Sequence, residues 1–576
     1  MFDFKKGSSK NDKPWVRGVN LGGWLVLERF ITPYFFALTT CHLEGDYRFY
    51  EGQIDAPPVD SSDYKKMNSK ECQPVLPYPV DEWTLTSAFA NKEVAKRWLE
   101  FHWDNFVKRK DISDLKASGV THIRVPLGHW IMGDIRDDEP WINGGWEYFV
   151  RLVEWCREDG IQVWPDIHTA PGSQNGFDNS GQLLPSPTCQ NWSGSTENVE
   201  RSLKVVRDVT QAVKDNGMED VVTGFGILNE PFVDCDVKVV KDFDNKALLI
   251  VRENLGEDAA VYIGDVFNST LWNDGWWTDE TDHANTFLDS HYYHVFAGRP
   301  RHLSPKQHIA LVCQHNYHDT VACCYSDHDS DASEGAIRKK TNTKPSHGIS
   351  RMIGEWSASF DTLVSDKLDQ VMAGVANNNV AIDFDREIGA KRQQFLSNFV
   401  KSQMVTYEAA HVGVSRAWFY WTMKMEGGAF AEWDFLRGIR EGWIPKIPAP
   451  NVASTDLYGS CYDILSQTED DMDIVHEFPA PTADNNNWQG IEITDDVVVS
   501  HGSSLMQNDK GYWVDPRMPN DPRTPNGQTA GENSGFIWLG GDLNWFGISL
   551  FSLVLLSIVC NIRRLRKPKR SGYESV

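Results

Sequence analysis

Two glutamates stand at the ends of apolar segments that are far apart in the chain. The first segment, "GFGILNEP" (224–231), ends with Asn229, Glu230 and a proline, and the second, "ISRMIGEW" (349–356), carries Glu355 next to its last residue. A carboxylate is costly to bury without partners, so both positions suggest a polar site. Retaining glycoside hydrolysis uses such a pair, with one carboxylic acid to protonate the leaving oxygen and one carboxylate to attack the sugar, about 5 to 5.5 Å apart.

The acid and the nucleophile need different pKa values, and other residues indicate how these could arise. We expect Arg124 to lie near Glu355 and to keep that carboxylate charged, and the charge on Glu355 to help keep Glu230 protonated. Asn229 could donate an amide hydrogen to the sugar 2-hydroxyl, an interaction that strengthens in the transition state. Tyr293 could hydrogen-bond to the nucleophile.

These residues need a scaffold, and eight short apolar runs supply one. Near-continuous apolar strands separated by crossover-length segments predict a parallel sheet, and eight of them predict an α/β fold of the (β/α)₈ barrel type. The runs are residues 16–23, 120–127, 161–168, 221–230, 259–265, 287–296, 349–356 and 415–424. In such a barrel the carboxyl ends of the strands form the functional face. Six of the runs bring polar or aromatic residues to that end, namely Arg124, Asp166, His168, Asn229, Glu230, His291, Tyr293, Glu355 and Trp421.

The segments between the runs fit this scheme. In "GGWEYFVRLVEWCREDG" the residues Phe149, Leu152, Val153 and Cys156 share one helical face, and Gly160 predicts the end of the helix. Polar insertions at about residues 37–90 and 313–346 interrupt the pattern, and we expect them to decorate one end of the barrel.

Composition narrows the range of ligands. The formal charge of −25 disfavours nucleic acid and anionic polymers as partners and favours a neutral ligand. The 23 tryptophans favour carbohydrate, because sugar rings offer flat apolar faces, and Trp421 could form the floor beneath a sugar.

The ten cysteines form neither a dense disulfide scaffold nor a paired zinc pattern. The densest patch, "CQHNYHDTVACCYSDH" (313–328), has a spacing that matches no zinc signature. We interpret it as a loop with a disulfide or free thiols.

The two ends of the chain give conflicting signals. Residues 543–562 contain no charge and are long enough to span a bilayer, and the basic segment 563–576 predicts a cytoplasmic tail. The barrel would then be extracellular or lumenal, joined to the membrane by an acidic and Pro/Asn/Gly-rich stalk (466–535). The polar segment 1–14 has no apolar core and is not a signal peptide as written. The sequons at Asn191 and Asn268 agree weakly with a secreted-type domain.

Five segments resemble the fungal-type exo-β-1,3-glucanases of glycoside hydrolase family 5. They are "RGVNLGGWLVLERFITPYFF" (17–36), "DIHTAPGSQNGFDNSG" (166–181), "ILNEP" (227–231), "HYYHVF" (291–296) and "IGEWSAS" (353–359), and the similarity extends over residues 15–465. The resemblance implies a (β/α)₈ catalytic domain and a retaining mechanism without metal or cofactor, with Glu230 as acid/base and Glu355 as nucleophile.

The resemblance also implies the surroundings of the substrate. The glucose would be held by Arg124, His168, Asn229, His291, Tyr293 and Trp421. Glu28 and Asp178 would bind sugar hydroxyls at the far end of the pocket, and Phe177 and Phe296 would clamp the next sugar. A family disulfide could join Cys313 and Cys461. Met423 departs from the family, which usually has tryptophan there, and this leaves substrate choice open.

These observations favour a membrane-anchored, monomeric exo-acting enzyme that removes glucose from the non-reducing ends of β-1,3-glucan. One alternative is a β-glucosidase or transglucosylase acting on another β-glucoside, such as β-1,6-glucan or a glucolipid. Another is an inactive barrel that binds carbohydrate at a membrane. The presence of Glu230 together with Glu355 argues against the inactive barrel, because binding alone requires neither an acid nor a nucleophile.

Overall fold

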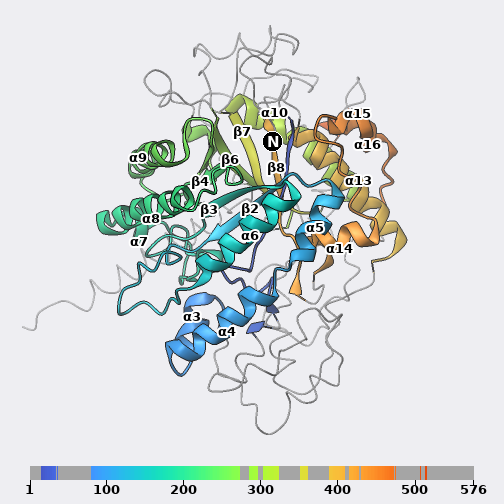
Figure 1. Cartoon of the computed structure of the whole chain (residues 1–576). Coiled ribbons are helices and arrows are strands. Elements are labelled where there is room, and N and C mark those ends of the chain that lie inside the picture. The colour runs from blue at the N-terminus through green and yellow to red at the C-terminus, as the bar shows by residue number, and fades with distance from the viewer. Residues whose placement is uncertain are drawn as a thin grey trace, which may run out of the picture.

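Eight parallel strands close into a barrel in which each strand pairs with the next and β8 pairs with β1 (Figure 1). The computed structural model describes residues 14–33, 35–36, 79–272, 285–295, 303–322, 350–360, 388–408, 414–426, 430–471, 474, 506–507 and 513–514. The strands are β1 (Val16–Asn20), β2 (His122–Leu127), β3 (Gln162–Ile167), β4 (Gly224–Gly226), β5 (Ala260–Gly264), β6 (Thr286–Tyr292), β7 (Ser350–Trp356) and β8 (Val414–Tyr420). The predicted (β/α)₈ barrel is confirmed, and each strand falls in one of the eight apolar runs or begins one residue before it.

The fourth strand is short, and its glycines explain how the barrel accommodates it. A Cβ at Gly224 would lie 2.6 Å from the Trp164 ring, and one at Gly226 would lie 2.4 Å from the Tyr262 ring. Both aromatic residues fill the barrel interior, where glycine leaves space for them. The chain therefore runs close to its neighbours before it reaches Asn229 and Glu230.

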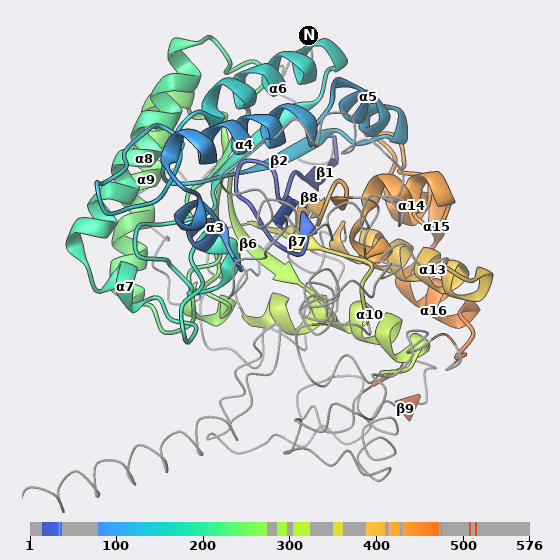
Figure 2. The same ribbon diagram turned by 90° about the horizontal axis from the view of Figure 1, so that it is seen from below.

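Helices surround the strands, as the view along the barrel in Figure 2 shows. Those on the crossovers are α4 (Lys92–Asn105), α5 (Arg109–Ser118), α6 (Gly145–Asp159), α8 (Thr196–Asp215), α9 (Val237–Leu255), α10 (Pro305–Ala322) and α13 (Ala390–Tyr407). Shorter helices are α3 (Glu82–Ala88), α7 (Gln190–Ser193), α14 (Phe435–Glu441), α15 (Ser454–Tyr458) and α16 (Cys461–Gln467), and 3₁₀ turns occur at η3 (Asp178–Ser180), η4 (Ser269–Trp272) and η8 (Ala431–Trp433).

Helix α6 shows how the sequence pattern becomes packing. Phe149, Leu152, Val153 and Cys156 are buried on one face, as their spacing predicts. The helix ends at Gly160, whose φ of 65° is a left-handed conformation that glycine adopts without steric cost. The predicted helix and its end are both confirmed.

A buried ion pair closes the amino-terminal end of the barrel. Arg17 is fully buried on β1, and its Nε donates to Glu408 Oε1 at 2.7 Å. Arg17 Nη2 donates to Glu408 Oε2 at 3.0 Å, and the other N–H groups of the guanidinium reach the carbonyl oxygens of Pro448, Ala449 and Val452, at 2.7, 2.9 and 2.6 Å. The ion pair joins β1 to the end of α13, and the carbonyl bonds join β1 to the segment after α14. Both lie at the end of the barrel away from Glu230 and Glu355.

The patch that begins at Cys313 differs from the expected loop. Residues 313–322 continue helix α10, so the loop interpretation is wrong for this part of the patch. Cys313 forms a disulfide with Cys461, as the resemblance implied. A second disulfide, Cys189–Cys235, was not predicted.

The expected membrane segment 543–562 and basic tail 563–576 lie outside the described residues. Within the described ranges, no helix has the length and apolar character needed to cross a membrane. A small antiparallel pair, β9 (Met506–Gln507) with β10 (Trp513–Val514), falls in the segment expected to be a stalk.

Candidate active site

Glu230 lies just beyond β4 in an unusual backbone conformation. Its φ of 44° is in the left-handed region, which is uncommon for a residue other than glycine. The carboxyl group accepts hydrogen bonds at both oxygens, from Asn179 Nδ2 at 2.8 Å and from His291 Nδ1 at 2.7 Å. The preceding residue is tied to β3, because the Asn229 N–H donates to the carbonyl oxygen of Ile167 at 2.9 Å.

Glu355 projects from β7 toward the same place. Arg124 donates from NH1 to Oε1 at 3.0 Å, and the Tyr293 hydroxyl donates to Oε2 at 2.7 Å. His291 Nδ1 lies 3.4 Å from the same Oε2. One ligand atom from each of Glu230, His291 and Glu355 lies within 4.8 Å of the other two, so the structure brings the two carboxyl groups together.

Arg124 is the cation that organises the floor of the site. It is fully buried, and besides Glu355 it contacts Asn20 Oδ1 at 2.9 Å, Asn229 Oδ1 at 2.7 Å and Asp166 Oδ2 at 3.3 Å. Since the amide oxygen of Asn229 accepts from Arg124, the amide nitrogen points the other way, toward His168 Nε2 at 3.4 Å. This orientation suits donation to a substrate hydroxyl.

His168 and Trp421 form an adjacent wall. His168 Nδ1 lies 2.9 Å from Asp166 Oδ2, and both side chains are buried. The ring of Trp421 stacks on that of His168, with centroids 5.6 Å apart and an interplanar angle of 12°. Trp421 is thereby fixed as a flat surface from β8, next to the residues of β3 and β4.

The sequence predicted a raised pKa for Glu230 and a lowered one for Glu355, and the structure gives the opposite directions. Burial raises the pKa of Glu230, but hydrogen bonding and charge from His291, together with Asn179 and His168, outweigh this, and the net pKa is lowered. Burial and the charge of Glu230 raise the pKa of Glu355, against the lowering effects of His291 and Arg124. The expectation was wrong because it omitted two effects: His291, which lowers the pKa of Glu230, and the burial of Glu355, whose effect exceeds that of Arg124.

His291 remains charged despite its burial. Desolvation lowers its pKa, but the charges of Glu355 and Asp289 and hydrogen bonds to Asp289 and Glu230 raise it well above its usual value. Asp289, two residues earlier on β6, lies 3.3 Å from His291 Nε2 through Oδ2. The imidazolium therefore lies between Asp289, on its Nε2 side, and the carboxylates of Glu230 and Glu355, on its Nδ1 side.

Glu28 and Asp178, the residues expected at the far end of the pocket, are both carboxyl groups with raised pKa values. Glu28 is buried, and burial together with the charges of Asp178, Glu355 and Glu230 raises its pKa well above the usual value. Among the described residues its Oε1 has no hydrogen-bond partner. Burial also raises the pKa of Asp178. In both carboxyl groups burial thus makes ionisation less favourable than in water.

Phe177, one half of the expected clamp, packs against other aromatic residues. The Phe177 ring packs edge-on against Phe232 at 5.6 Å and against Phe267 at 6.4 Å. Phe296, the other half of the expected clamp, lies outside the described residues. Met423 is buried, and its N–H donates to the carbonyl oxygen of Asn20 at 2.8 Å.

Several residues of the site were missed by the sequence reasoning. Asn179 and Asp289 contact Glu230 and His291, and Asn20 contacts Arg124. Asp289 precedes His291 by two positions on the same strand, a spacing that places both side chains on one face and could have revealed it. Asn179 lies in a loop, where no periodicity signals its direction.

A closed parallel barrel that carries two buried glutamates, an arginine and a histidine at the carboxyl ends of its strands defines the class of (β/α)₈ glycoside hydrolases. Comparison with known proteins places the chain within that class. Residues 88–383 match the family "Cellulase (glycosyl hydrolase family 5)". The chain belongs to glycosyl hydrolase family 5.

Its relatives are fungal proteins. The chain is 29% identical over 440 residues to Glucan 1,3-beta-glucosidase 2 of Wickerhamomyces anomalus, covering 76% of this chain and 88% of that protein. It is 30% identical over 437 residues to Probable glucan 1,3-beta-glucosidase A of Aspergillus fumigatus, covering 75% and 87%. The crystal structure of rutinosidase from Aspergillus niger is 16% identical, with a TM-score of 0.47, covering 75% of this chain and 98% of that one.

Proposed function

We propose that this protein is a retaining exo-β-1,3-glucanase that releases glucose from the non-reducing ends of β-1,3-glucans. The observation that carries the proposal is that one carboxyl oxygen of Glu230 lies within 4.8 Å of one carboxyl oxygen of Glu355. This suits direct attack by a carboxylate, whereas an inverting enzyme needs about 6.5 to 9.5 Å to admit a water between the groups. The choice of glucan rests on the relatives, which are described as glucan 1,3-beta-glucosidases.

The roles of the two glutamates follow from their positions. In the first step Glu230 gives its proton to the glycosidic oxygen while the Glu355 carboxylate forms a bond to the anomeric carbon and the glycosidic bond breaks. In the second step Glu230 takes a proton from water, which attacks the anomeric carbon and releases β-glucose and the Glu355 carboxylate. Asn229 Nδ2 binds the 2-hydroxyl, and Trp421 lies under the sugar ring.

The stereochemistry of the product tests the mechanism. The full chain is incubated with a laminarin-type glucan and with an aryl β-glucoside, and the anomer released first is followed by NMR. We expect β-glucose. Early release of α-glucose would refute the retaining mechanism, and a glucosylated acceptor in place of free glucose would indicate a transglucosylase.

Two substitutions test the residue roles. Glu355→Gln should lose nearly all activity on both substrates. Glu230→Gln should lose roughly 10²- to 10⁴-fold on the glucan but keep attack on an aryl glucoside with a good leaving group, since such a group departs without a proton. Glu147→Gln, at an exposed glutamate on α6, is the matched control and should be unchanged. Normal turnover by Glu355→Gln would exclude it as the nucleophile.

We also propose that the barrel lies on the extracellular or lumenal side of a membrane. The Cys189–Cys235 and Cys313–Cys461 disulfides support an oxidising compartment. Protease treatment of sealed vesicles should leave a lumenal barrel intact until detergent is added, and digestion without detergent would contradict the proposal.

A further inference from the structure

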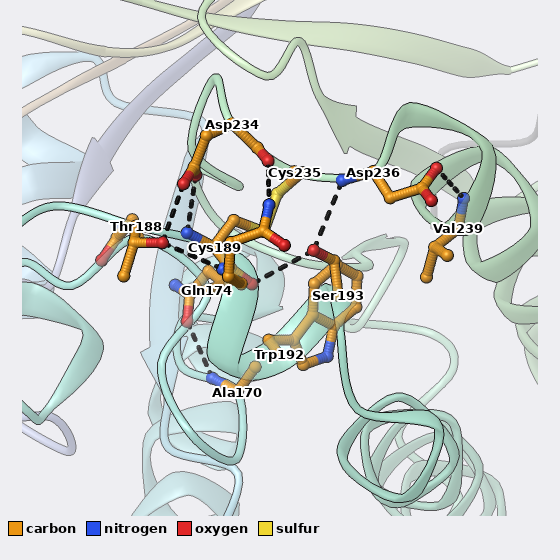
Figure 3. The surroundings of a disulfide bond; sticks show 12 residues. Ala170, Gln174, Thr188, Cys189, Trp192, Ser193, Asp234, Cys235, Asp236 and Val239 are labelled. Carbon is orange, nitrogen blue, oxygen red and sulfur yellow. Dashed lines mark hydrogen bonds between the residues drawn. A yellow bond between two sulfur atoms is a disulfide. The ribbon is translucent and has the colours of Figure 1, made fainter. Parts of the chain in front are cut away.

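The loop that follows β4 must hold Glu230 in its strained conformation. Glu230 has a φ of 44°, and a non-glycine residue persists in this strained region only where the surroundings fix it. Besides the bond from the Asn229 N–H to Ile167, two further groups hold residues 229–235. Figure 3 shows both groups. One is the side chain of Gln174, and the other is the Cys189–Cys235 disulfide.

Gln174 binds the loop at the peptide that carries Glu230. Its Nε2 donates to the carbonyl oxygen of Asn229 at 2.9 Å, which belongs to the peptide bond between Asn229 and Glu230. Its backbone carbonyl oxygen accepts from the Phe232 N–H at 3.0 Å. The chain is therefore held immediately before Glu230 and again two residues after it.

The same side chain is fixed to the loop after β3. Gln174 is fully buried, its Nε2 also donates to the His168 carbonyl oxygen at 2.8 Å, and its Oε1 accepts from the Ala170 N–H at 2.9 Å. Both donors and the acceptor of the amide are in use. The amide of Gln174 thus joins the carbonyl oxygen of His168 to the carbonyl oxygen of Asn229, which precedes Glu230.

The disulfide holds the far end of the loop. Cys189 is bonded to Cys235, and the Asp234 carboxylate accepts from the Cys189 N–H at 2.7 Å and from the Thr188 hydroxyl at 2.8 Å. Figure 3 shows these groups together with the hydrogen bond between Gln174 and Ala170. The anchor at residues 234–235 limits how far the loop can move. Of these two anchors, Gln174 is the one that donates to the peptide between Asn229 and Glu230.

We propose that Gln174 is a positioning residue for the acid/base Glu230, an inference that rests on the proposed retaining mechanism. Without its amide, two carbonyl oxygens lose a buried donor, and the Glu230 backbone is free to relax toward a more common conformation. The carboxyl group then moves away from the glycosidic oxygen. A displacement of about 1 Å can cost roughly 10²-fold in a step that depends on proton transfer. The attack by Glu355, which projects from β7, is affected less.

The test compares substrates that differ in their need for an acid. Gln174→Met keeps the size of the side chain but removes the amide. We expect kcat/KM on phenyl β-glucoside to fall at least about 10-fold more than on 2,4-dinitrophenyl β-glucoside. Azide should also accelerate turnover of the dinitrophenyl substrate, because it attacks the glucosyl-enzyme without a general base. The ratio of the two substrates does not depend on how much of the protein is folded.

Control variants distinguish a positioning role of Gln174 from an effect on stability, and test separately the proposed acid/base role of Glu230. Asn254→Leu removes another buried amide, whose Nδ2 donates to Thr210 Oγ1 at 2.8 Å between α9 and α8, and should leave the substrate ratio unchanged. Gln174→Glu keeps the acceptor for Ala170 and should show the same selective loss if Gln174→Met does not fold. Equal losses on both substrates without azide acceleration would overturn the positioning role. If Glu230→Gln itself shows no selectivity, the acid assignment fails instead.

Discussion

Glu82 is a buried carboxyl group that should make the stability of the barrel fall as pH rises. It begins α3 with 1% of its surface exposed, and its Oε2 accepts from the Leu27 N–H at 2.8 Å, next to Glu28. Burial, opposed by the Leu27 hydrogen bond and aided by the charge of Asp81, raises the pKa of Glu82 from 4.5 to about 8. The folded protein therefore binds this proton more tightly than the unfolded chain.

The sign and size of the effect follow from linkage. Below the unfolded pKa of 4.5 the group is protonated in both states and costs nothing; as pH rises toward about 8, only the unfolded state gains by ionising. The shift of about 3.5 units corresponds to at most about 5 kcal/mol, lost at about 1.4 kcal/mol per pH unit between pH 5 and 7.5. The free energy of unfolding is thus highest in acid with respect to this group. Above pH 8 it has fallen by the full amount.

Glu82→Gln isolates this contribution, since glutamine keeps an acceptor for the Leu27 N–H and cannot ionise. The free energy of unfolding in urea should rise relative to the wild type as pH increases, by about 3 kcal/mol or more at pH 7.5. Glu93→Gln, at an exposed position on α4, should follow the wild type at every pH. Parallel pH profiles for Glu82→Gln and the wild type from pH 5 to 8.5 would refute the reasoning.

Two further substitutions probe the scaffold away from the site. Arg17→Met leaves Glu408 buried without its cation and should lower the free energy of unfolding by about 3–5 kcal/mol, whereas kcat of the folded fraction stays unchanged; a loss below 1 kcal/mol would contradict the role of the pair. Replacing Cys313 and Cys461 by serine opens a link across 148 residues and should cost up to about 5 kcal/mol by chain entropy, measured by the same urea titration. An unchanged midpoint would show that the disulfide adds nothing.

The barrel could be predicted because its strands are buried on both faces. Runs 120–127 and 161–168 each have five apolar residues among eight, counting proline. The structure forms β2 and β3 there in register, with Arg124 opposite Trp164. The same logic located the polar residues that end the runs. The prediction of a loop after Cys313 was wrong. The histidines, cysteines and aspartates there show no apolar period, although the chain continues as α10.

The contacts that the sequence did not reveal are those made by loops. Gln174 and Asn179 lie in the loop after β3, and what they bind is decided by how that loop folds back on β4. Cys189 and Cys235 are separated by 46 residues, and nothing in their spacing distinguishes them from the other cysteines. Such pairings depend on the three-dimensional path of the chain, on which local patterns carry no information.

His291 explains how a glutamate with a lowered pKa can serve as the acid. Its Nδ1 lies 2.7 Å from Glu230 Oε1, and its Nε2 lies 3.3 Å from Asp289 Oδ2. Moving one proton from Nδ1 to Oε1 converts an imidazolium–carboxylate pair into a neutral imidazole and a carboxylic acid, with no change in total charge. Groups this strongly coupled titrate as a unit, with pKa values that belong to the pair. The proposed acid role therefore requires one proton on the pair formed by Glu230 and His291, and a raised pKa of Glu230 alone is not needed.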